Sequence, residues 1–230
     1  MIYVISHAPL SYELPLGMQS WRLDVNPGLL HPSYAEMRCH FDVWTNWPRE
    51  RWWAGFHHYR RAFLFPTVST ELVREVMRWP LASHFEVSQA RFFEHLASPE
   101  TDLMMYADVV CRVPEMCGVG NLNWGCRPQD WEIFAEAIRD QGYDLSIPYF
   151  LACNMFLMKW GLFDRYMQDW RRVFTEVEGS ISPPDPPDYQ HRVFGFLSER
   201  FFTLWLHRER CTNPSLRVLF LPVLFCPQMK

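Results

Sequence analysis

The sequence contains few of the signatures that define the common enzyme classes. It has no glycine-rich dinucleotide or P-loop motif, no G-x-S-x-G elbow, no H-E-x-x-H pair and no D-x-D. The first four absences argue against a Rossmann oxidoreductase, an NTPase, a serine hydrolase and a zinc peptidase. Without D-x-D, the chain lacks the carboxylate pair with which many nucleotide-sugar enzymes hold a divalent ion, so we expect no metal and no other cofactor.

Paired cysteines are also missing. The seven cysteines form no C-x-x-C pair, and their odd number and irregular spacing favour reduced thiols in a cytoplasmic protein. A zinc site built from Cys111, Cys117, Cys126 and His191 is disfavoured, because these spacings fit no finger or ribbon pattern. A net charge of −4, from 22 basic and 26 acidic residues, gives no indication of nucleic-acid binding.

No apolar run approaches the roughly 18 residues that a membrane-spanning helix needs. Residues 1–8 lack both the basic segment and the long apolar segment of a signal peptide, so we expect none. We therefore expect a cytoplasmic protein. The aromatic and basic segment 205–230 allows peripheral contact with the inner face of a membrane, although a buried strand and tail explain it equally well.

Apolar and aromatic residues are abundant, at 49% and 17% of the 230 residues. A chain of this size buries about 70% of its surface, which is enough for one core without disulfide or metal support. We therefore expect a single domain over residues 1–230. Most aromatic side chains should fill that core, and some could line a pocket for sugars or bases.

Hydrophobic periodicity predicts strands that alternate with helices. We expect strands at 2–5, 52–56, 103–110 and 148–158, the last ending near Asn154, and helices at 34–47, 69–79, 88–96, 129–141, 164–177 and 189–207. Ser33 and Glu36 have the spacing of a capping box for the first helix. This alternation indicates an α/β fold with a mostly parallel sheet and helices on both faces.

The densest polar cluster, HHYRR at 57–61, follows the strand expected at 52–56. In open α/β sheets, ligands bind beyond the carboxyl ends of strands, and the planar guanidinium of arginine suits phosphate. A cationic rim is one interpretation, and surface arginines paired with Glu50 or Glu71 are the other. Successive strand residues point to opposite faces, so only one of Arg60 and Arg61 is expected to reach a phosphate.

Two further clusters are weaker alone. Asn154 heads the apolar run NMFLMK at 154–159, which an ordinary core strand with a polar cap also explains. In the segment 192–200, Arg192, Glu199 and Arg200 fall near one face of a helix whose other face is apolar. An intrahelical salt-bridge face is the alternative there. Because its surroundings are rich in phenylalanine, we expect Glu199 to face a pocket.

Together these segments resemble a family of capsular and exopolysaccharide biosynthesis proteins, long catalogued as a domain of unknown function and now regarded as glycosyltransferases. The matching strings, in chain order, are IYVISH (2–7), SYAEM (33–37), GFHHYRRAF (55–63), NMFLMK (154–159) and RVFGFLSER (192–200). HYRR and RVFGFLSER are specific in combination.

The resemblance implies a GT-A-like nucleotide-sugar transferase. It would move a hexosyl group, such as galactosyl, from a nucleoside-diphosphate sugar to a polysaccharide or glycolipid acceptor. Donor-binding residues would be Ser6, His7, His58, Tyr59, Arg60, Arg61, Asn154 and Arg192. Glu199 would be the catalytic carboxylate, with Asp130 in reserve. Arg60 and Arg61 would hold the diphosphate in place of a metal, and the glycine-bearing loop 111–128 would become ordered when substrate binds.

Two alternatives remain open at this stage. A non-catalytic carbohydrate- or nucleotide-sugar-binding protein on the same fold would also lack D-x-D and be rich in aromatic residues. A cysteine hydrolase would use Cys153 or Cys126 with a histidine, but nothing around either thiol suggests activation.

Overall fold

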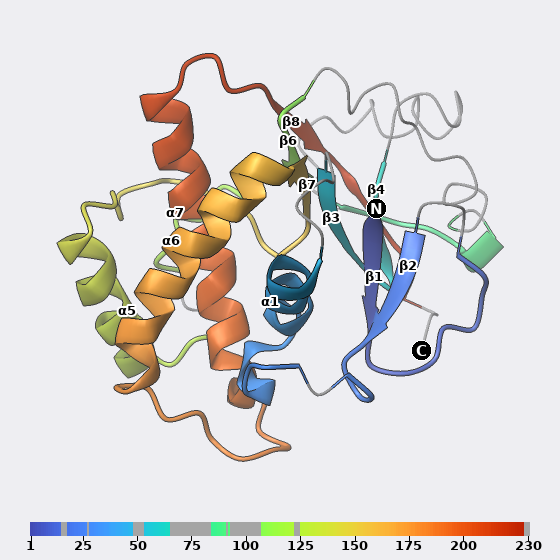
Figure 1. Ribbon diagram of the computed structural model, residues 1–230, viewed down its shortest axis with the longest axis horizontal. Helices are drawn as coiled ribbons and strands as arrows, with labels where there is room; N and C mark the ends of the chain where they lie inside the picture. Colours follow the sequence, from blue (N-terminus) through green and yellow to red (C-terminus); the bar gives the residue numbers. More distant parts are fainter. Residues whose placement is uncertain are drawn as a thin grey trace.

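In the computed structural model, short β-branched and aromatic runs form one sheet (Figure 1). The structure describes residues 1–14, 18–26, 28–47, 53–64, 84–90, 92, 107–121 and 125–227. The strands are β1 (Ile2–Ser6), β2 (Met18–Arg22), β3 (Trp53–His58), β4 (Arg61–Phe63), β5 (His84–Glu86), β6 (Val109–Arg112), β7 (Phe156–Lys159), β8 (Val218–Leu221) and β9 (Val223–Phe225). The expected strands at 2–5 and 52–56 are confirmed as β1 and β3.

The sheet runs in the order β5-β9-β4-β3-β7-β6-β8, and β1 joins it by pairing with both β3 and β2. Parallel pairs are β1–β2, β1–β3, β5–β9 and β6–β8, whereas β3–β4, β3–β7, β4–β9 and β6–β7 are antiparallel. The sheet is thus more evenly mixed than the sequence indicated. One cause is local: only Tyr59 and Arg60 separate β3 from β4, and so short a connection permits only an antiparallel hairpin.

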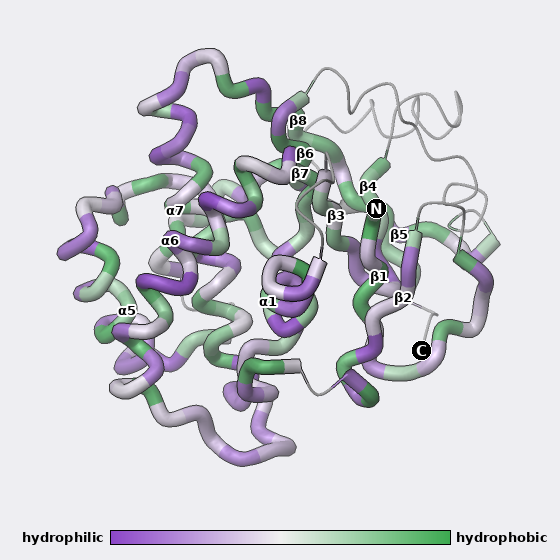
Figure 2. The backbone as a smooth tube through the Cα atoms, in the orientation of Figure 1, coloured by the Kyte–Doolittle hydropathy of each residue, from purple (hydrophilic) through white to green (hydrophobic). Residues whose placement is uncertain are grey.

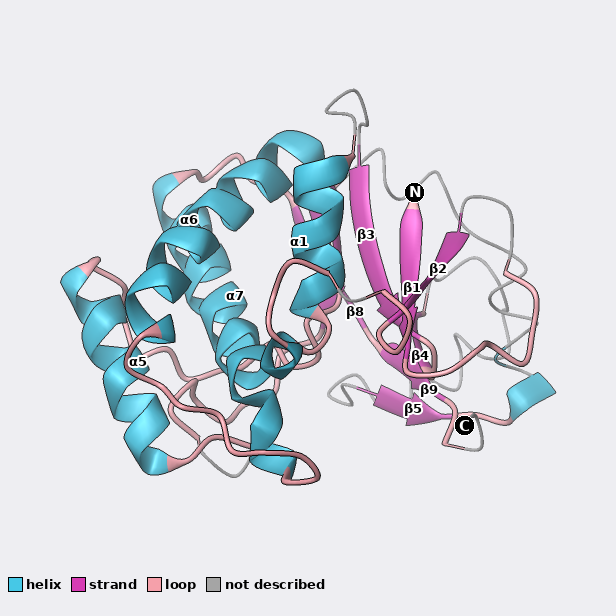
Figure 3. Ribbon diagram, turned by 60° about the horizontal axis from the view of Figure 1, so that its bottom comes forward, coloured by secondary structure: helices cyan, strands magenta, loops and turns pink. Residues whose placement is uncertain are grey.

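Four long helices lie together on one side of the sheet (Figure 3). They are α1 (Met37–Asn46), α5 (Pro128–Asp140), α6 (Trp160–Glu178) and α7 (Val193–Thr212), with short 3-10 turns η1 (Pro32–Tyr34) and η3 (Tyr189–Arg192). The helix expected at 69–79 and most of that at 88–96 lie outside the described residues. Purple and green alternate along α6 in Figure 2, as an amphipathic helix requires.

The aromatic residues mostly fill the core, as expected. Between sheet and helices, Phe156 stacks on Phe202 with ring centroids 4.9 Å apart, and Tyr166 meets Trp205 edge-on at 5.2 Å. On the other face of the sheet a second apolar cluster contains the buried Leu157. The sheet is therefore buried on both faces, which positions its strand ends rigidly.

The C-terminal segment is better explained by the buried alternative than by membrane contact. Trp205 is fully buried and donates its Nε1–H to Asp169, while Leu224 and Cys226 are buried beside β4. Within the part of the chain that the structure describes, no helix is both long and apolar enough to cross a membrane.

The capping-box prediction is wrong. Residues 32–34 form the separate turn η1, and the Ser33 hydroxyl hydrogen-bonds His31 Nδ1 at 2.7 Å. Helix α1 starts only at Met37, and Glu36 makes no capping hydrogen bond with its side chain. The Glu36 carboxylate instead turns away from the helix and into the site described below.

Candidate functional site

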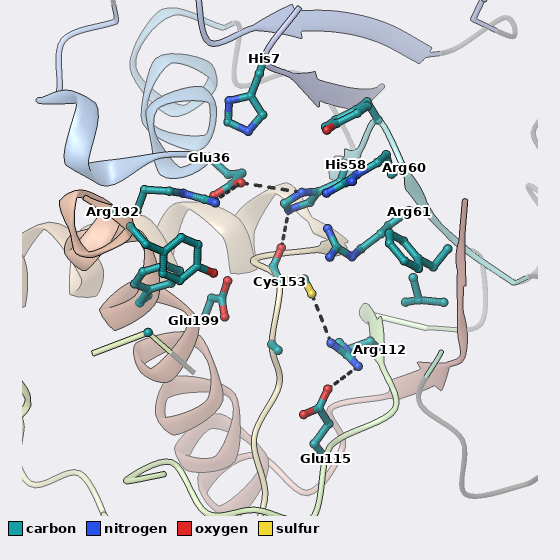
Figure 4. A pocket seen from close by; sticks show the side chains of 17 residues that line it. His7, Glu36, His58, Arg60, Arg61, Arg112, Glu115, Cys153, Arg192 and Glu199 are labelled. Carbon is teal, nitrogen blue, oxygen red and sulfur yellow. Dashed lines mark hydrogen bonds and ion pairs between the residues drawn. The ribbon is translucent and has the colours of Figure 1, made fainter. Parts of the chain in front are cut away.

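A cavity of about 520 Å³ opens where β1 and the β3–β4 hairpin end (Figure 4). Its polar and charged lining comprises His7, Glu36, His58, Tyr59, Arg60, Arg61, Arg112, Glu115, Cys153, Tyr189, Arg192 and Glu199. Seven of the ten residues expected at a site from the sequence lie in this lining. The cavity thus occupies the expected edge of the sheet.

Arg60 and Arg61 both line the cavity, and which of them reaches a phosphate stays a prediction. Arg60 lies in the turn before β4 and not in a strand, so the alternation of strand side chains does not apply to the pair. Their guanidinium carbons lie 5.5 Å and 5.0 Å from the Phe225 ring centroid. Neither forms an ion pair with any described residue, so both half-buried charges are available to a ligand.

Glu36 is buried at the centre of the site. Its Oε1 lies 2.6 Å from an Arg192 guanidinium nitrogen and 3.8 Å from His58 Nδ1. Burial alone would raise the pKa of Glu36, but Arg192 and His58 outweigh it and hold this pKa at about 2. Glu36 is therefore ionised at neutral pH and neutralises Arg192.

His58 is held by one hydrogen bond. Its Nε2 lies 2.8 Å from the Cys153 carbonyl oxygen, which can only accept, so Nε2 carries the proton; Nδ1 lies 3.8 Å from Glu36 Oε1, beyond hydrogen-bond distance. Burial lowers the pKa of His58 to about 4 despite the nearby Glu36 carboxylate. The imidazole is accordingly neutral at pH 7.

Glu199, on α7, lines the same cavity, as expected from the sequence. Burial, and secondly the negative charge of Glu36, raise the pKa of Glu199 to about 7, although the Cys153 backbone N–H partly offsets this. Two carboxylates in one cavity thus have pKa values pushed far apart, an arrangement typical of sites that separate acid–base roles.

A second charged pair, Arg112 with Glu115, also lines the cavity. Arg112 donates to Glu115 at 2.6 Å and to Cys153 Sγ at 3.2 Å. Burial raises the pKa of the Cys153 thiol and brings that of Cys126 to about 11, so both thiols are protonated at neutral pH. The cysteine-hydrolase alternative therefore receives no support from the structure.

Three of the expected site residues lie outside the cavity lining. Ser6 donates its hydroxyl to the Ala8 carbonyl at 2.8 Å. Asn154 is buried behind the site and donates to the Gly195 carbonyl at 3.0 Å. Asp130 is buried on α5 and accepts two hydrogen bonds from Arg127, at 2.6 and 2.9 Å. We therefore do not retain Asp130 as a reserve catalytic carboxylate.

The alternative interpretation of residues 192–200, an intrahelical salt-bridge face, does not hold. Arg192 ends η3 and pairs with Glu36, which lies 156 positions earlier in the chain. Arg200 is fully buried and donates to the carbonyls of Phe196 and Asn121. The polar groups of this segment thus serve three different contacts.

Five polar members of the lining were not expected from the sequence: Glu36, Arg112, Glu115, Cys153 as a pocket residue, and Tyr189. Glu36 lay in the matching string SYAEM, which was a usable signal, but it was interpreted as a helix cap. Arg112 and Glu115 fall in the segment that was expected to be a loop, and no motif marked them.

The residues present do not fit a metal ion. In the described ranges no group of three or more His, Cys, Asp or Glu side chains is placed to hold one. Within the cavity, Glu36 and Glu115 are engaged by arginines, which leaves Glu199 as the carboxylate without an arginine ion pair. Residues 122–124 of the loop expected to order on binding lie outside the described residues, so that prediction stays untested.

Comparison with known proteins bears on the fold. Residues 135–210 match a family model described as a domain of unknown function, DUF4422. No curated protein matches the chain significantly. The solved apo structure of WbbM, a bifunctional glycosyltransferase, is similar with a TM-score of 0.76 at 17% identity, over 100% of this chain and 45% of that chain. The chain therefore spans less than half of WbbM, and it shares the α/β fold of that part, as predicted.

Proposed function

We propose that the chain is a glycosyltransferase, acting as one domain over residues 1–230. It would transfer a hexosyl group from a nucleoside-diphosphate sugar to a hydroxyl of a polysaccharide or glycolipid. The observation that carries this proposal is one cavity that combines two arginines, which pair with no carboxylate among the described residues, with a carboxylate, Glu199, whose pKa is about 7.

The charges in the cavity suit a diphosphate. Arg192 is neutralised by Glu36 and Arg112 by Glu115, so Arg60 and Arg61 leave two positive charges uncompensated. A leaving nucleoside diphosphate develops negative charge as its bond to the sugar breaks. Fixed guanidinium groups stabilise that charge without reorganisation, and each lost contact of this kind typically costs about 10²–10³ in rate.

Glu199 suits the role of general base. When ionised, it would take the proton of the acceptor hydroxyl while that oxygen bonds to the anomeric carbon and the diphosphate departs towards Arg60 and Arg61. A base with a pKa near the working pH combines a large ionised fraction with adequate basicity. His58 would act as a neutral positioning group, because its Nε2–H is engaged by the Cys153 carbonyl.

The test is nucleoside-diphosphate release from a panel of UDP-, GDP- and dTDP-hexoses, with and without glycan acceptors. We expect acceptor-stimulated release with at least one donor. Because arginines would take the place of a metal, EDTA should change the rate less than twofold, and a rate abolished by EDTA and restored by manganese would refute that part. Donor binding without turnover across the panel would favour the non-catalytic alternative.

A further inference from the structure

One wall of the cavity is a single stripe on η3 and α7. Tyr189, Arg192, Phe196 and Glu199 follow one another at intervals of three, four and three residues, and all four line the cavity. Helical residues at these intervals share one face. Along the stripe, the ring of Tyr189 is followed by the Arg192 guanidinium, which Glu36 neutralises, then by the ring of Phe196 and finally by the Glu199 carboxylate.

Tyr189 is the exposed member of this stripe. It is 62% exposed, which is unusual for a large aromatic side chain in this protein, while Phe196 is only 6% exposed. Their ring centroids lie 5.0 Å apart at an angle of 39°. Phe196 therefore supports one side of the Tyr189 ring, and the rest of that ring is open.

Phe196 is itself held in place from two directions. The Arg192 guanidinium lies 5.5 Å from its ring centroid. The backbone of Gly125 approaches so closely that a Cβ there would lie 2.8 Å from Phe196 Cε2. At this position the chain accommodates the ring only because glycine has no side chain, and φ of +86° also favours glycine.

The stripe and the free cations face each other. Figure 4 shows Arg192 and Glu199 on one side of the cavity and Arg60 and Arg61 on the other. A donor whose diphosphate is bound by Arg60 and Arg61 leaves the Glu199 side for the second substrate. The open aromatic ring lies on that same side.

We propose that Tyr189, supported by Phe196, is a stacking platform for a hexose ring of the acceptor. This inference rests on the proposed function. The apolar face of a pyranose packs on an aromatic ring, while its hydroxyls remain free to meet polar groups. A sugar stacked there would present a hydroxyl to Glu199, so the platform sets which acceptor hydroxyl reacts.

The experiment measures sugar binding directly by saturation-transfer NMR, with methyl glycosides of glucose, galactose and mannose as probes and UDP present. We expect transfer concentrated on one face of at least one hexoside. Tyr189→Ala should weaken its binding about five- to tenfold, and Tyr189→Phe should stay within about twofold of the wild type. Leu29→Ala, which removes an exposed apolar side chain away from the cavity lining, is the matched control.

Two results would overturn the platform: no hexoside bound by the wild type, or equal binding by Tyr189→Ala. If the uracil of UDP stacks on Tyr189 in place of the acceptor sugar, Tyr189→Ala should bind UDP more weakly. That result would also refute the acceptor platform. Because Tyr189 is exposed, the variant should keep its melting temperature. Failure of the proposed function is distinguishable, since it would appear as no donor turnover even where hexoside binding depends on Tyr189.

Discussion

Replacing Glu199 by glutamine tests the catalytic and the electrostatic parts of the site together. The amide keeps the size of the side chain and can still accept the Cys153 backbone N–H, but it can neither ionise nor take a proton. If Glu199 is the general base, Glu199→Gln should lower kcat about 10²–10⁴-fold. The wild-type rate should rise with pH through about 7 and then level off, and the residual rate of the variant should lack that step.

The same substitution has a predictable effect on stability. Because burial raises the folded-state pKa of Glu199 from its ordinary 4.5 to about 7, the folded chain holds more protons than the unfolded chain between these values. For this group, the free energy of unfolding therefore falls as pH rises through that window. The shift corresponds to at most about 3 kcal/mol, and solvent screening brings the expected cost to about 1–3 kcal/mol.

Urea unfolding, followed by tryptophan fluorescence, measures this cost. The stability of Glu199→Gln relative to the wild type should increase by about 1–3 kcal/mol between pH 5 and pH 8. Glu209→Gln is the matched control, because Glu209 lies on the same helix outside the cavity and pairs with Arg165. A stability difference that does not change with pH would refute the electrostatic reasoning, and unchanged kcat would remove Glu199 from the mechanism.

Four other substitutions probe the remaining groups. Arg60→Ala and Arg61→Ala should each weaken UDP binding in calorimetry about ten- to a hundredfold, at about 1.5–3 kcal/mol per lost charged contact, without lowering the melting temperature. Glu36→Gln should leave Arg192 unpaired, destabilise the fold, and shift the acidic limb of the pH–rate profile to lower pH, because Glu36 helps to raise the pKa of Glu199. Gly125→Ala should displace the Phe196 ring and so raise the KM for the acceptor more than the KM for the donor. Equal increases in the two KM values would contradict the placement of the acceptor.

Local patterns predicted the elements that depend on local physics. The run of β-branched and aromatic residues at 2–5 formed β1, and apolar residues at helical spacing gave α5 within one residue of its expected ends. The rule that ligands bind beyond strand ends located the cavity from HHYRR alone. None of these inferences needed information about distant parts of the chain.

The rest depended on contacts between distant segments. Glu36 satisfied the spacing of a capping box, and only the fold reveals that Arg192 competes for its carboxylate across 156 positions. Asp130 looked like a free acid in the sequence, yet Arg127 engages it fully. Both carboxylates show that sequence spacing identifies possible partners, while burial and competing partners decide between them.

The two carboxylates of the cavity depend on each other. An arginine close to Glu199 and without a partner would stabilise its ionised form and lower its pKa, which would weaken it as a base. Arg200 and Arg192 do lower the pKa of Glu199, but burial and the negative charge of Glu36, which also pairs with Arg192, outweigh them. Because the Glu36 carboxylate pairs with Arg192, it does not neutralise Arg60 or Arg61, whose positive charges remain available to a ligand. A buried residue that touches neither substrate in the proposed mechanism would thus determine both how the cavity binds phosphate and at which pH its base works.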